Sequence, residues 1–336
     1  MKKCVLCNHN EAKKKNTHYL TDAIIRTCLN YEGGNKREKG FFFKISNGSP
    51  FVEFGFQRNT PTKIIEKELR RGSSDYENAD AKKNPYAVND VFCSDCENLF
   101  GKIEEPFVTN IHSQISKLEL VQYPFIFNDS RFVRLFFILQ FWRCHVCNTE
   151  IKLNQRVAEE FRGIIQNYDK IDIDVLKKYP MSVSFILSPK QKDHTRHFVG
   201  MASVRNPYVI FMNDYVIQLY DDMKNVNFYS LYGLNNKETF MDYINYNEDN
   251  FKIQIIQNNS WWQISYRFFQ CEIIPLVVNE FINSYRDKVG RTPSIKEIKE
   301  IVRYYEDNRI SLSFTKDTLQ DIVNQYFKYN YGRCYE

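Results

Sequence analysis

Cys4-Val5-Leu6-Cys7 and Cys93-Ser94-Asp95-Cys96 are the two stretches that decide how the first hundred residues of this 336-residue chain fold. Each is a Cys-x-x-Cys turn, which presents two thiolates at the spacing of a zinc knuckle. Two such turns supply the four soft ligands of a tetrahedral Zn²⁺ site. We therefore predict one structural zinc ion, bound by Cys4, Cys7, Cys93 and Cys96. The alternative is that these are unrelated core or surface thiols.

The cysteines also bear on the location of the protein. There are nine, an odd number, and Met1-Lys2-Lys3 leads into the first turn without an apolar signal segment. These features predict a reducing cytoplasm, where thiolates remain available to a metal. The longest apolar run, Phe132 to Trp142, is too short to span a membrane and contains Arg134 and Gln140. No membrane partner is therefore expected.

Positive charge is concentrated at the N-terminus. The chain has a net charge of +5, but residues 1–45 contain ten Lys and Arg against Glu11, Asp22, Glu32 and Glu38. This segment therefore carries +6 and the rest of the chain −1. A basic metal-binding module suits contact with phosphates, so nucleic acid is the expected partner. The alternative is a solvated lysine face.

Apolar spacing and turn residues predict the elements between the two cysteine turns. Residues 19–29 have the periodicity of a helix. Residues 41–56 form two apolar runs around Asn47-Gly48, which is typical of a β-hairpin. Residues 61–71 are expected to form a short charged helix, and the polar residues 72–85 an exposed loop.

The second part of the chain mixes helices and strands. Residues 131–148 are apolar on nearly all sides, which predicts a buried helix, and residues 150–179 predict an amphipathic helical region. An antiparallel sheet is expected from the strand-like segments 182–187, 198–204, 208–211, 215–220 and 251–256. Closing helices are expected at 272–286, 294–307 and 316–329, the second of which starts after Pro293-Ser294.

The residues around the cysteine turns resemble the zinc-bearing branch of the HNH endonucleases. The resemblance rests on Cys4 and Cys7, on His18, on Asn89, and on the run Cys93-Ser-Asp-Cys96-Glu-Asn-Leu-Phe-Gly-Lys-Ile-Glu104. The chain is also similar to uncharacterised bacterial proteins in which a Cys-x-x-Cys-Glu knuckle precedes an apolar helix that ends in Trp-Arg, as Phe141-Trp142-Arg143 does.

The resemblance implies an α+β protein with two parts. Residues 1–105 would form a treble-clef, HNH-like zinc module with a large insertion at about 31–87. The helical and strand-like segments described above predict a mixed α+β domain of unknown role over residues 106–336, with helices at its C-terminus. In a conflict-system effector, this domain would recognise a trigger, a protein partner or the substrate.

The resemblance also implies roles for three residues. His18 would be the general base that activates a water, Asn89 would orient it, and Glu97 would take the last position of the motif. Glu97 offers an oxygen ligand for Mg²⁺ or Mn²⁺. The chain departs from the family pattern at Thr17, where an acidic residue is usual, and lacks the proline that usually follows the histidine. A structural histidine or a zinc ligand therefore remain alternatives for His18.

Other polar clusters carry weaker signals. Cys144-His145-Val146-Cys147 is a third Cys-x-x-Cys, for which core packing is the main expectation and a second metal or redox site the alternative. The pair His194 and His197 is expected in a polar loop, and Trp261-Trp262 in the core or, alternatively, as a base-stacking platform.

The leading functional hypothesis is metal-dependent cleavage of phosphodiester bonds in nucleic acid, DNA before RNA, in a bacterial conflict or anti-phage defence setting. The rival is a zinc finger that has lost catalysis and serves as a nucleic-acid-binding or protein-interaction module. A third hypothesis is a regulator whose last helices bind DNA, because Gly290 to Ser294 is similar to the opening of a helix-turn-helix.

Overall fold

The computed structural model describes residues 2–28, 41–46, 49–56, 61–69, 72–80, 86–118, 124–147, 150–187, 198–202, 206–231, 234–257, 271, 273–308 and 316–331. His194, His197 and Trp261-Trp262, discussed above, lie outside these residues.

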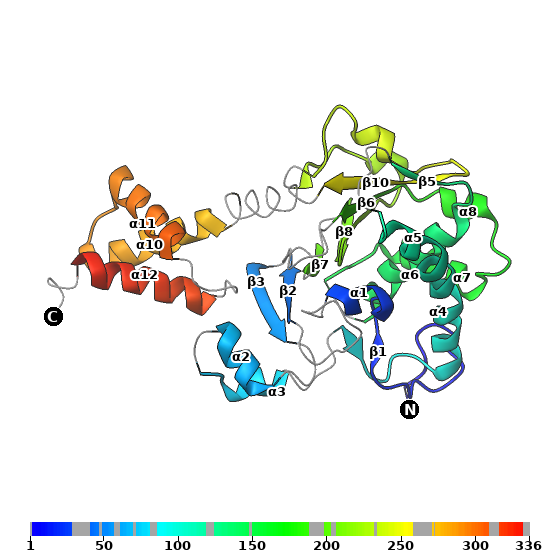
Figure 1. The fold of residues 1–336 in the computed structure, drawn as a ribbon, viewed down its shortest axis with the longest axis horizontal. Helices are drawn as coiled ribbons and strands as arrows, with labels where there is room; N and C mark the ends of the chain where they lie inside the picture. Colours follow the sequence, from blue (N-terminus) through cyan, green and yellow to red (C-terminus); the bar gives the residue numbers. More distant parts are fainter. Residues whose placement is uncertain are drawn as a thin grey trace.

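An eight-stranded sheet forms the centre of the fold (Figure 1). Its strands are β2 (Phe41–Ser46), β3 (Ser49–Phe56), β5 (Phe125–Phe127), β6 (Met181–Leu187), β7 (Phe198–Ala202), β8 (Tyr208–Met212), β9 (Tyr215–Leu219) and β10 (Phe251–Gln257). They are ordered β3-β2-β7-β8-β9-β6-β10-β5. A separate two-stranded ribbon pairs β1 (Thr17–His18) with β4 (Ala87–Val88).

The helices lie around this sheet and at the C-terminal end of the chain. They are α1 (Asp22–Cys28), α2 (Thr62–Leu69), α3 (Asp75–Asp80), α4 (Ser94–Phe107), α5 (Ser113–Ile115), α6 (Arg131–Val146), α7 (Gln155–Gln166), α8 (Ile173–Lys177), α10 (Ile274–Val289), α11 (Ile295–Asn308) and α12 (Lys316–Tyr331). A π-helical turn (Val108–His112) extends α4, and two 3₁₀ turns lie at Met223–Asn225 and Phe240–Tyr243.

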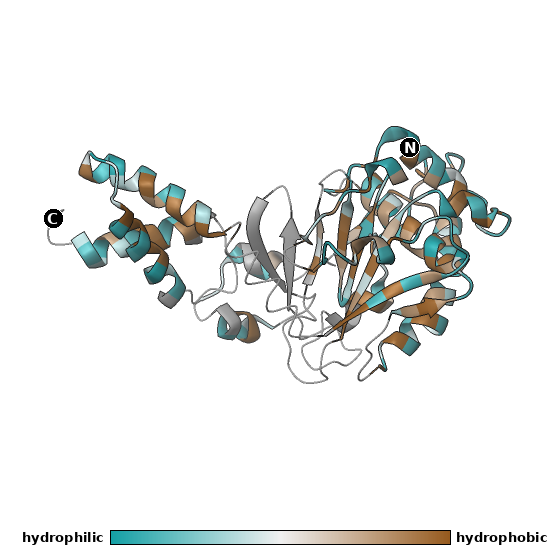
Figure 2. Ribbon diagram, turned by 90° about the horizontal axis from the view of Figure 1, so that it is seen from above, coloured by the Kyte–Doolittle hydropathy of each residue, from teal (hydrophilic) through white to brown (hydrophobic). Residues whose placement is uncertain are grey.

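Helix α6 is the apolar centre of the molecule, as the sequence predicted. Phe136 stacks on Phe107 of α4 with ring centroids 3.8 Å apart. On the sheet side, Phe137 contacts Tyr215 of β9 and Phe251 of β10. Figure 2 shows the corresponding pattern, with apolar residues along the strands. Burial between the sheet and other helices explains why α6 lacks a polar face.

The central strand β6 shows how both faces of the sheet are covered. Val183 and Phe185 join the main core with the helices, whereas Ile186 points to the other face. There it clusters with Val209 and Val216 under a cover that includes Leu231. Side chains alternate between faces along a strand, and every residue of β6 is buried, with the small side chains of Ser182 and Ser184 on the same face as Ile186.

Most of the predicted elements are confirmed. Each of the five predicted strands corresponds to one of β6 to β10, and the hairpin at 41–56 is β2 paired with β3. The sheet is mixed rather than wholly antiparallel, because β2 pairs with β7, and β6 with β10, in parallel. The connections between these partners are long enough for the crossover that parallel pairing requires.

The prediction of a loop at 72–85 is wrong in part, because α3 lies within it. The backbone N–H of Asn78 donates to Ser74 at 3.1 Å and so closes the first turn of this helix. Serine just before a helix is a favoured capping residue. The polar composition of the segment predicted its exposure correctly but gave no sign of this six-residue helix.

Helices α10, α11 and α12 share a hydrophobic core of their own, which includes Phe281, Tyr285 and Phe327. The start of α11 after Pro293-Ser294 is confirmed. Ser294 and Glu297 form a capping box, in which the Glu297 N–H donates to Ser294 Oγ at 3.3 Å and the Ser294 N–H donates to Glu297 Oε2 at 2.7 Å. This arrangement explains the sharp start of the helix.

The main core joins residues from both parts expected from the sequence. It extends from Cys4 and Leu20 through Phe100 and Phe136 to Ile253. The expected boundary between the two parts, at residue 105, falls within helix α4. The division of the chain into these two parts stays a prediction. Within the described residues, every helix is too short or too polar to cross a membrane.

Candidate metal centre

The first pair of cysteines lies on a tight backbone turn. The Cys4 N–H donates to the Asn10 carbonyl at 2.8 Å, and the Asn8 N–H donates to the Cys4 carbonyl at 2.9 Å. Asn8 adopts a φ of 57°, a left-handed conformation that Asn tolerates better than most residues. The turn therefore directs the thiols of Cys4 and Cys7 to the same side.

The second pair lies at the start of α4. Cys93 is the N-cap residue of the helix, and Cys96 lies in its first turn. The unpaired N–H groups and the dipole at a helix start favour negative charge, so this position suits thiolate ligands. Asn10 adds a side-chain N–H that lies 3.7 Å from the Cys93 sulfur and donates to Asp95 at 2.9 Å.

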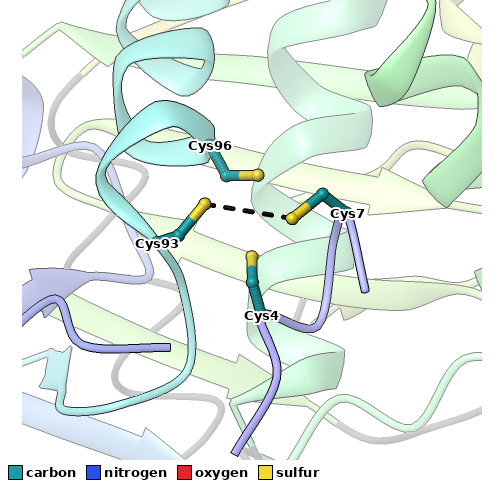
Figure 3. A group of neighbouring side chains, drawn as sticks. All are labelled: Cys4, Cys7, Cys93 and Cys96. Carbon is teal, nitrogen blue, oxygen red and sulfur yellow. Dashed lines mark hydrogen bonds between the residues drawn. The ribbon is translucent and has the colours of Figure 1, made fainter. Parts of the chain in front are cut away.

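The four sulfur atoms converge on one point (Figure 3). All lie within 4.8 Å of one another, and the Cys7 and Cys93 sulfurs are 3.9 Å apart. A tetrahedral ion with Zn–S bonds of about 2.3 Å places its sulfurs about 3.8 Å apart. The predicted cluster of Cys4, Cys7, Cys93 and Cys96 can thus hold a metal ion.

Burial and hydrogen bonds shift the pKa values of three of the cysteines. Burial raises the pKa of Cys4, and burial together with the neighbouring Cys93 and Cys4 raises the pKa of Cys96. Burial also acts on Cys7, but hydrogen bonds from the Asn10 and His9 backbone outweigh it and lower the pKa of Cys7 to about 7. A divalent cation at the centre would stabilise all four thiolates and overcome the cost of burying them.

Three aromatic rings next to the second cysteine turn join α4 to α6. Phe92 precedes the second turn, and its ring centroid lies 5.0 Å from that of Phe100 on α4 and 6.0 Å from that of Trp142 on α6. The first turn is fastened by its Leu6 carbonyl, which accepts hydrogen bonds at 2.8 Å from both Arg162 and Gln166 of α7. The metal centre is therefore built into the main body of the fold.

The ribbon of β1 and β4 carries His18 beside this centre. His18 pairs with Ala87 and Thr17 with Val88 across the ribbon. The His18 Nε2 lies 3.5 Å from an Asp22 carboxylate oxygen, and the two side chains are 18% and 21% exposed. This geometry gives a partly accessible imidazole next to a carboxylate, a combination that suits proton transfer.

Asn89 and Glu97 have other partners. The Asn89 Oδ1 accepts from the Asn16 backbone N–H at 2.8 Å. The Glu97 Oε2 accepts from the Thr17 hydroxyl at 3.1 Å, and burial raises the pKa of this carboxyl. Neighbours on a strand point to opposite faces, so Thr17 and His18 direct their side chains to different sides of the ribbon. The structure thus gives each of the three predicted site residues a different partner.

Asp22 is the site residue that the motif comparison did not include. The expected acidic residue directly before His18 is replaced by Thr17, but the fold brings a carboxylate from four residues further along the chain. His18 ends β1 and Asp22 begins α1, so their contact depends on the turn between these two elements, and no helical spacing rule indicates it.

Basic residues surround the first turn on its outer side. Five exposed lysines lie on the two strands of chain that flank it: Lys2, Lys3, Lys13, Lys14 and Lys15. Lys13 forms an ion pair with Glu11 and Lys15 with Asp90. The backbone bridge between Lys3 and Glu11 joins the two segments, so the five lysines come from neighbouring stretches of backbone.

The third Cys-x-x-Cys lies at the end of α6, with Cys144 fully buried. Among the residues that the structure describes, three or more ligand atoms of Cys, His, Asp or Glu converge only at Cys4, Cys7, Cys93 and Cys96, so Cys144 and Cys147 belong to no such group. Burial raises the pKa of Cys147 to about 12. The structure therefore favours core packing over a second metal or redox site for this pair.

We expect Cys147 to resist alkylation. At pH 7.5, its raised pKa reduces the reactive thiolate fraction on the order of a thousandfold relative to an ordinary thiol. Iodoacetamide labelling followed by mass spectrometry should modify the exposed Cys271 first and leave Cys147 unmodified in the folded protein, whereas urea should make both reactive. Labelling of Cys147 as fast as Cys271 would contradict the expectation.

Comparisons with protein-family models, with curated protein sequences and with solved structures find no match to this chain.

Proposed function

We propose that Cys4, Cys7, Cys93 and Cys96 bind one structural Zn²⁺, and that the surrounding residues form a treble-clef module. Four thiolates in tetrahedral arrangement suit zinc better than the harder divalent ions. The order of elements supports the treble-clef assignment: a cysteine turn, the ribbon of β1 and β4, and then α4 with the second pair at its start. Zinc here stabilises the fold and takes no part in chemistry, because all four positions are filled by thiols.

We further propose that this module cleaves phosphodiester bonds in nucleic acid, as an endonuclease of HNH type. The observation that carries the proposal is the His18 imidazole beside the Asp22 carboxylate. In this role, the water forms a new bond to phosphorus as His18 accepts its proton, and the bond from phosphorus to one sugar oxygen breaks, with the departing oxygen taking its proton from solvent. Asp22 orients the imidazole ring and stabilises its protonated form. The exposed lysines beside the first turn would bind the phosphates of the strand.

The three predicted positions do not come together as the ion-binding set of HNH chemistry. Mg²⁺ usually takes one or two protein carboxylates and completes its shell with waters and substrate phosphates. Glu97 is held by Thr17, and His18 lies by Asp22, so their ligand atoms do not converge among the residues that the structure describes. The mechanism above therefore assigns no step to this ion.

The second candidate is a module that binds nucleic acid without cleaving it. The separate partners of His18, Asn89 and Glu97 favour this candidate, because an HNH site needs these positions to act together. The zinc centre and the exposed lysines would serve it equally well. The two candidates differ only in the chemistry at His18.

We expect His18→Ala to reduce plasmid nicking about 10²- to 10⁴-fold, the usual contribution of a general base. Asp22→Asn should reduce it less, because the imidazole remains. The measurement is nicking of supercoiled plasmid with Mg²⁺, with Mn²⁺ and with EDTA, on protein of verified zinc content. His9→Ala is the matched control: it removes an exposed imidazole from the same module and should leave nicking unchanged.

The same experiment separates the two candidates. Plasmid binding without nicking by the wild-type protein would support the binding module and remove the endonuclease. Nicking that His18→Ala retains would remove His18 from the mechanism. A wild-type protein that neither binds nor nicks DNA or RNA would contradict both candidates.

A further inference from the structure

A buried arginine contacts the backbone at His18. Arg143, near the end of α6, is only 2% exposed. Its Nη1 donates to the His18 backbone carbonyl at 3.2 Å, and its Nη2 forms an ion pair with Glu104 of α4. The guanidinium carbon also lies 5.4 Å from the centre of the Phe100 ring. One side chain thus joins α6, α4 and β1.

The hydrogen bonds of Arg143 and Glu104 also reach Thr21, three residues after His18. The Thr21 hydroxyl donates to Glu104 at 2.6 Å, and the Thr21 N–H donates to the Gln140 side-chain oxygen at 3.0 Å. Arg143 Nη2 lies within hydrogen-bond distance of both, 3.4 Å from the Thr21 hydroxyl and 3.2 Å from the Gln140 oxygen. The network therefore holds the chain at residue 18 and again at residue 21.

These two points bracket the turn that places His18 against Asp22. His18 ends β1, and Asp22 begins α1, so their separation depends on the path of the three residues between them. At 3.5 Å, the contact between imidazole and carboxylate tolerates little movement of either backbone. Fixing residues 18 and 21 therefore fixes the pair.

Only a guanidinium can make these contacts together. Its planar fork donates in several fixed directions, whereas a lysine ammonium is a point charge on a flexible stem. Arg143 uses one terminal nitrogen for the His18 carbonyl and the other for Glu104. A buried ion pair is weak evidence of stabilisation, since apolar packing often serves as well. The need for hydrogen bonds in several fixed directions therefore explains why an arginine stands at position 143 better than its charge does.

We propose that Arg143 is a positioning residue, which holds the His18 backbone so that the imidazole meets Asp22. Its effect on activity rests on the proposed endonuclease function, but its effect on the geometry of His18 does not. The two can therefore be measured separately.

The experiment compares two buried arginines of the same helix. Arg143→Lys is the test variant, and Arg134→Lys is the matched control. Arg134 is fully buried, and it donates to the backbone carbonyls of Tyr179 and Asn245 at 3.4 Å, away from His18. Both variants exchange a buried guanidinium for an ammonium, so they place a similar stress on the fold.

The first readout is the imidazole signal of His18 in two-dimensional NMR of the full zinc-loaded chain, assigned with His18→Gln. Arg143→Lys should shift this signal, and Arg134→Lys should leave it in place. The second readout is plasmid nicking, which Arg143→Lys should reduce about a hundredfold, the effect of a displacement near 1 Å at a catalytic group. Zinc content should equal that of the wild type in both variants.

An unchanged His18 signal in Arg143→Lys would overturn the proposal, as would equal shifts in both variants, which would indicate general loosening. If wild-type protein does not nick plasmid, the endonuclease function fails, while the NMR comparison still decides the role of Arg143. If Arg143→Lys does not fold, Glu104→Gln replaces it. This variant keeps an acceptor for Thr21 but loses the ion pair with Arg143, so the His18 signal should shift, and no shift would again overturn the proposal.

Discussion

Cys93→Ser should abolish metal binding and unfold the N-terminal part of the chain. A hydroxyl replaces one of four converging thiols at the N-cap of α4, and the remaining three cannot complete a tetrahedral site. Metal binding in four-cysteine modules contributes roughly 10 kcal/mol or more to folding. A domain of ordinary size has a free energy of unfolding of about 5–15 kcal/mol, so losing the contribution of the metal would remove an amount comparable with the entire stability of the domain.

The measurement combines elemental analysis with circular dichroism. The wild-type protein should contain about one zinc per chain and the variant less than about a tenth of that. Cys271→Ser and Cys147→Ser are the matched controls, since each removes a thiol outside the cluster and should retain the metal. A stable wild-type protein without metal, or a Cys93→Ser variant that keeps its zinc, would contradict the metal centre.

Trp142→Ala should lower the free energy of unfolding by about 3–5 kcal/mol, the usual cost of truncating a large core aromatic. Trp142 is 1% exposed, and its ring contacts Phe92 and Phe100, directly below the cysteines. The cavity would therefore loosen the contact between α6 and α4. We expect a weaker metal centre as well as a less stable fold.

Chemical denaturation followed by far-ultraviolet circular dichroism measures this effect, and competition with a chelator measures zinc affinity. Phe132→Ala on the same helix is the control: its side chain is 42% exposed, so the loss should be about 1 kcal/mol or less. A loss in Trp142→Ala no larger than in this control would show that the aromatic cluster does not support the metal centre.

The parts of the fold that depend on local patterns were predictable from the sequence. The Cys-x-x-Cys turns present their thiols through a few neighbouring backbone bonds, so each pair could be recognised from its spacing. The meeting of Cys4 and Cys7 with Cys93 and Cys96 was predicted from the four ligands that a zinc ion needs. The long apolar run of α6 and the short apolar runs 208–211 and 215–220 could likewise be assigned from their length and residue types, which are local properties of the sequence.

The parts that depend on distant contacts were not predictable. The parallel neighbour of β6 is β10, and that of β2 is β7, and no local pattern distinguishes these partners from antiparallel ones. At the candidate site, Arg143 meets His18 across 125 residues of sequence. Asp22 lies within the helix predicted over residues 19–29, but its contact with His18 depends on the turn between β1 and α1, which no local pattern indicates.

The attachment of Leu6 to α7 has a consequence for the order of events on the ribosome. The carbonyl in the first cysteine turn and its donors Arg162 and Gln166 are 156 and 160 residues apart. Cys96, the last of the four converging cysteines, is synthesised about 70 residues before Gln166, which at 5–20 residues per second corresponds to several seconds. A nascent chain can therefore bring the four cysteines together, and bind the proposed metal ion, before α7 emerges and forms its hydrogen bonds with the Leu6 carbonyl.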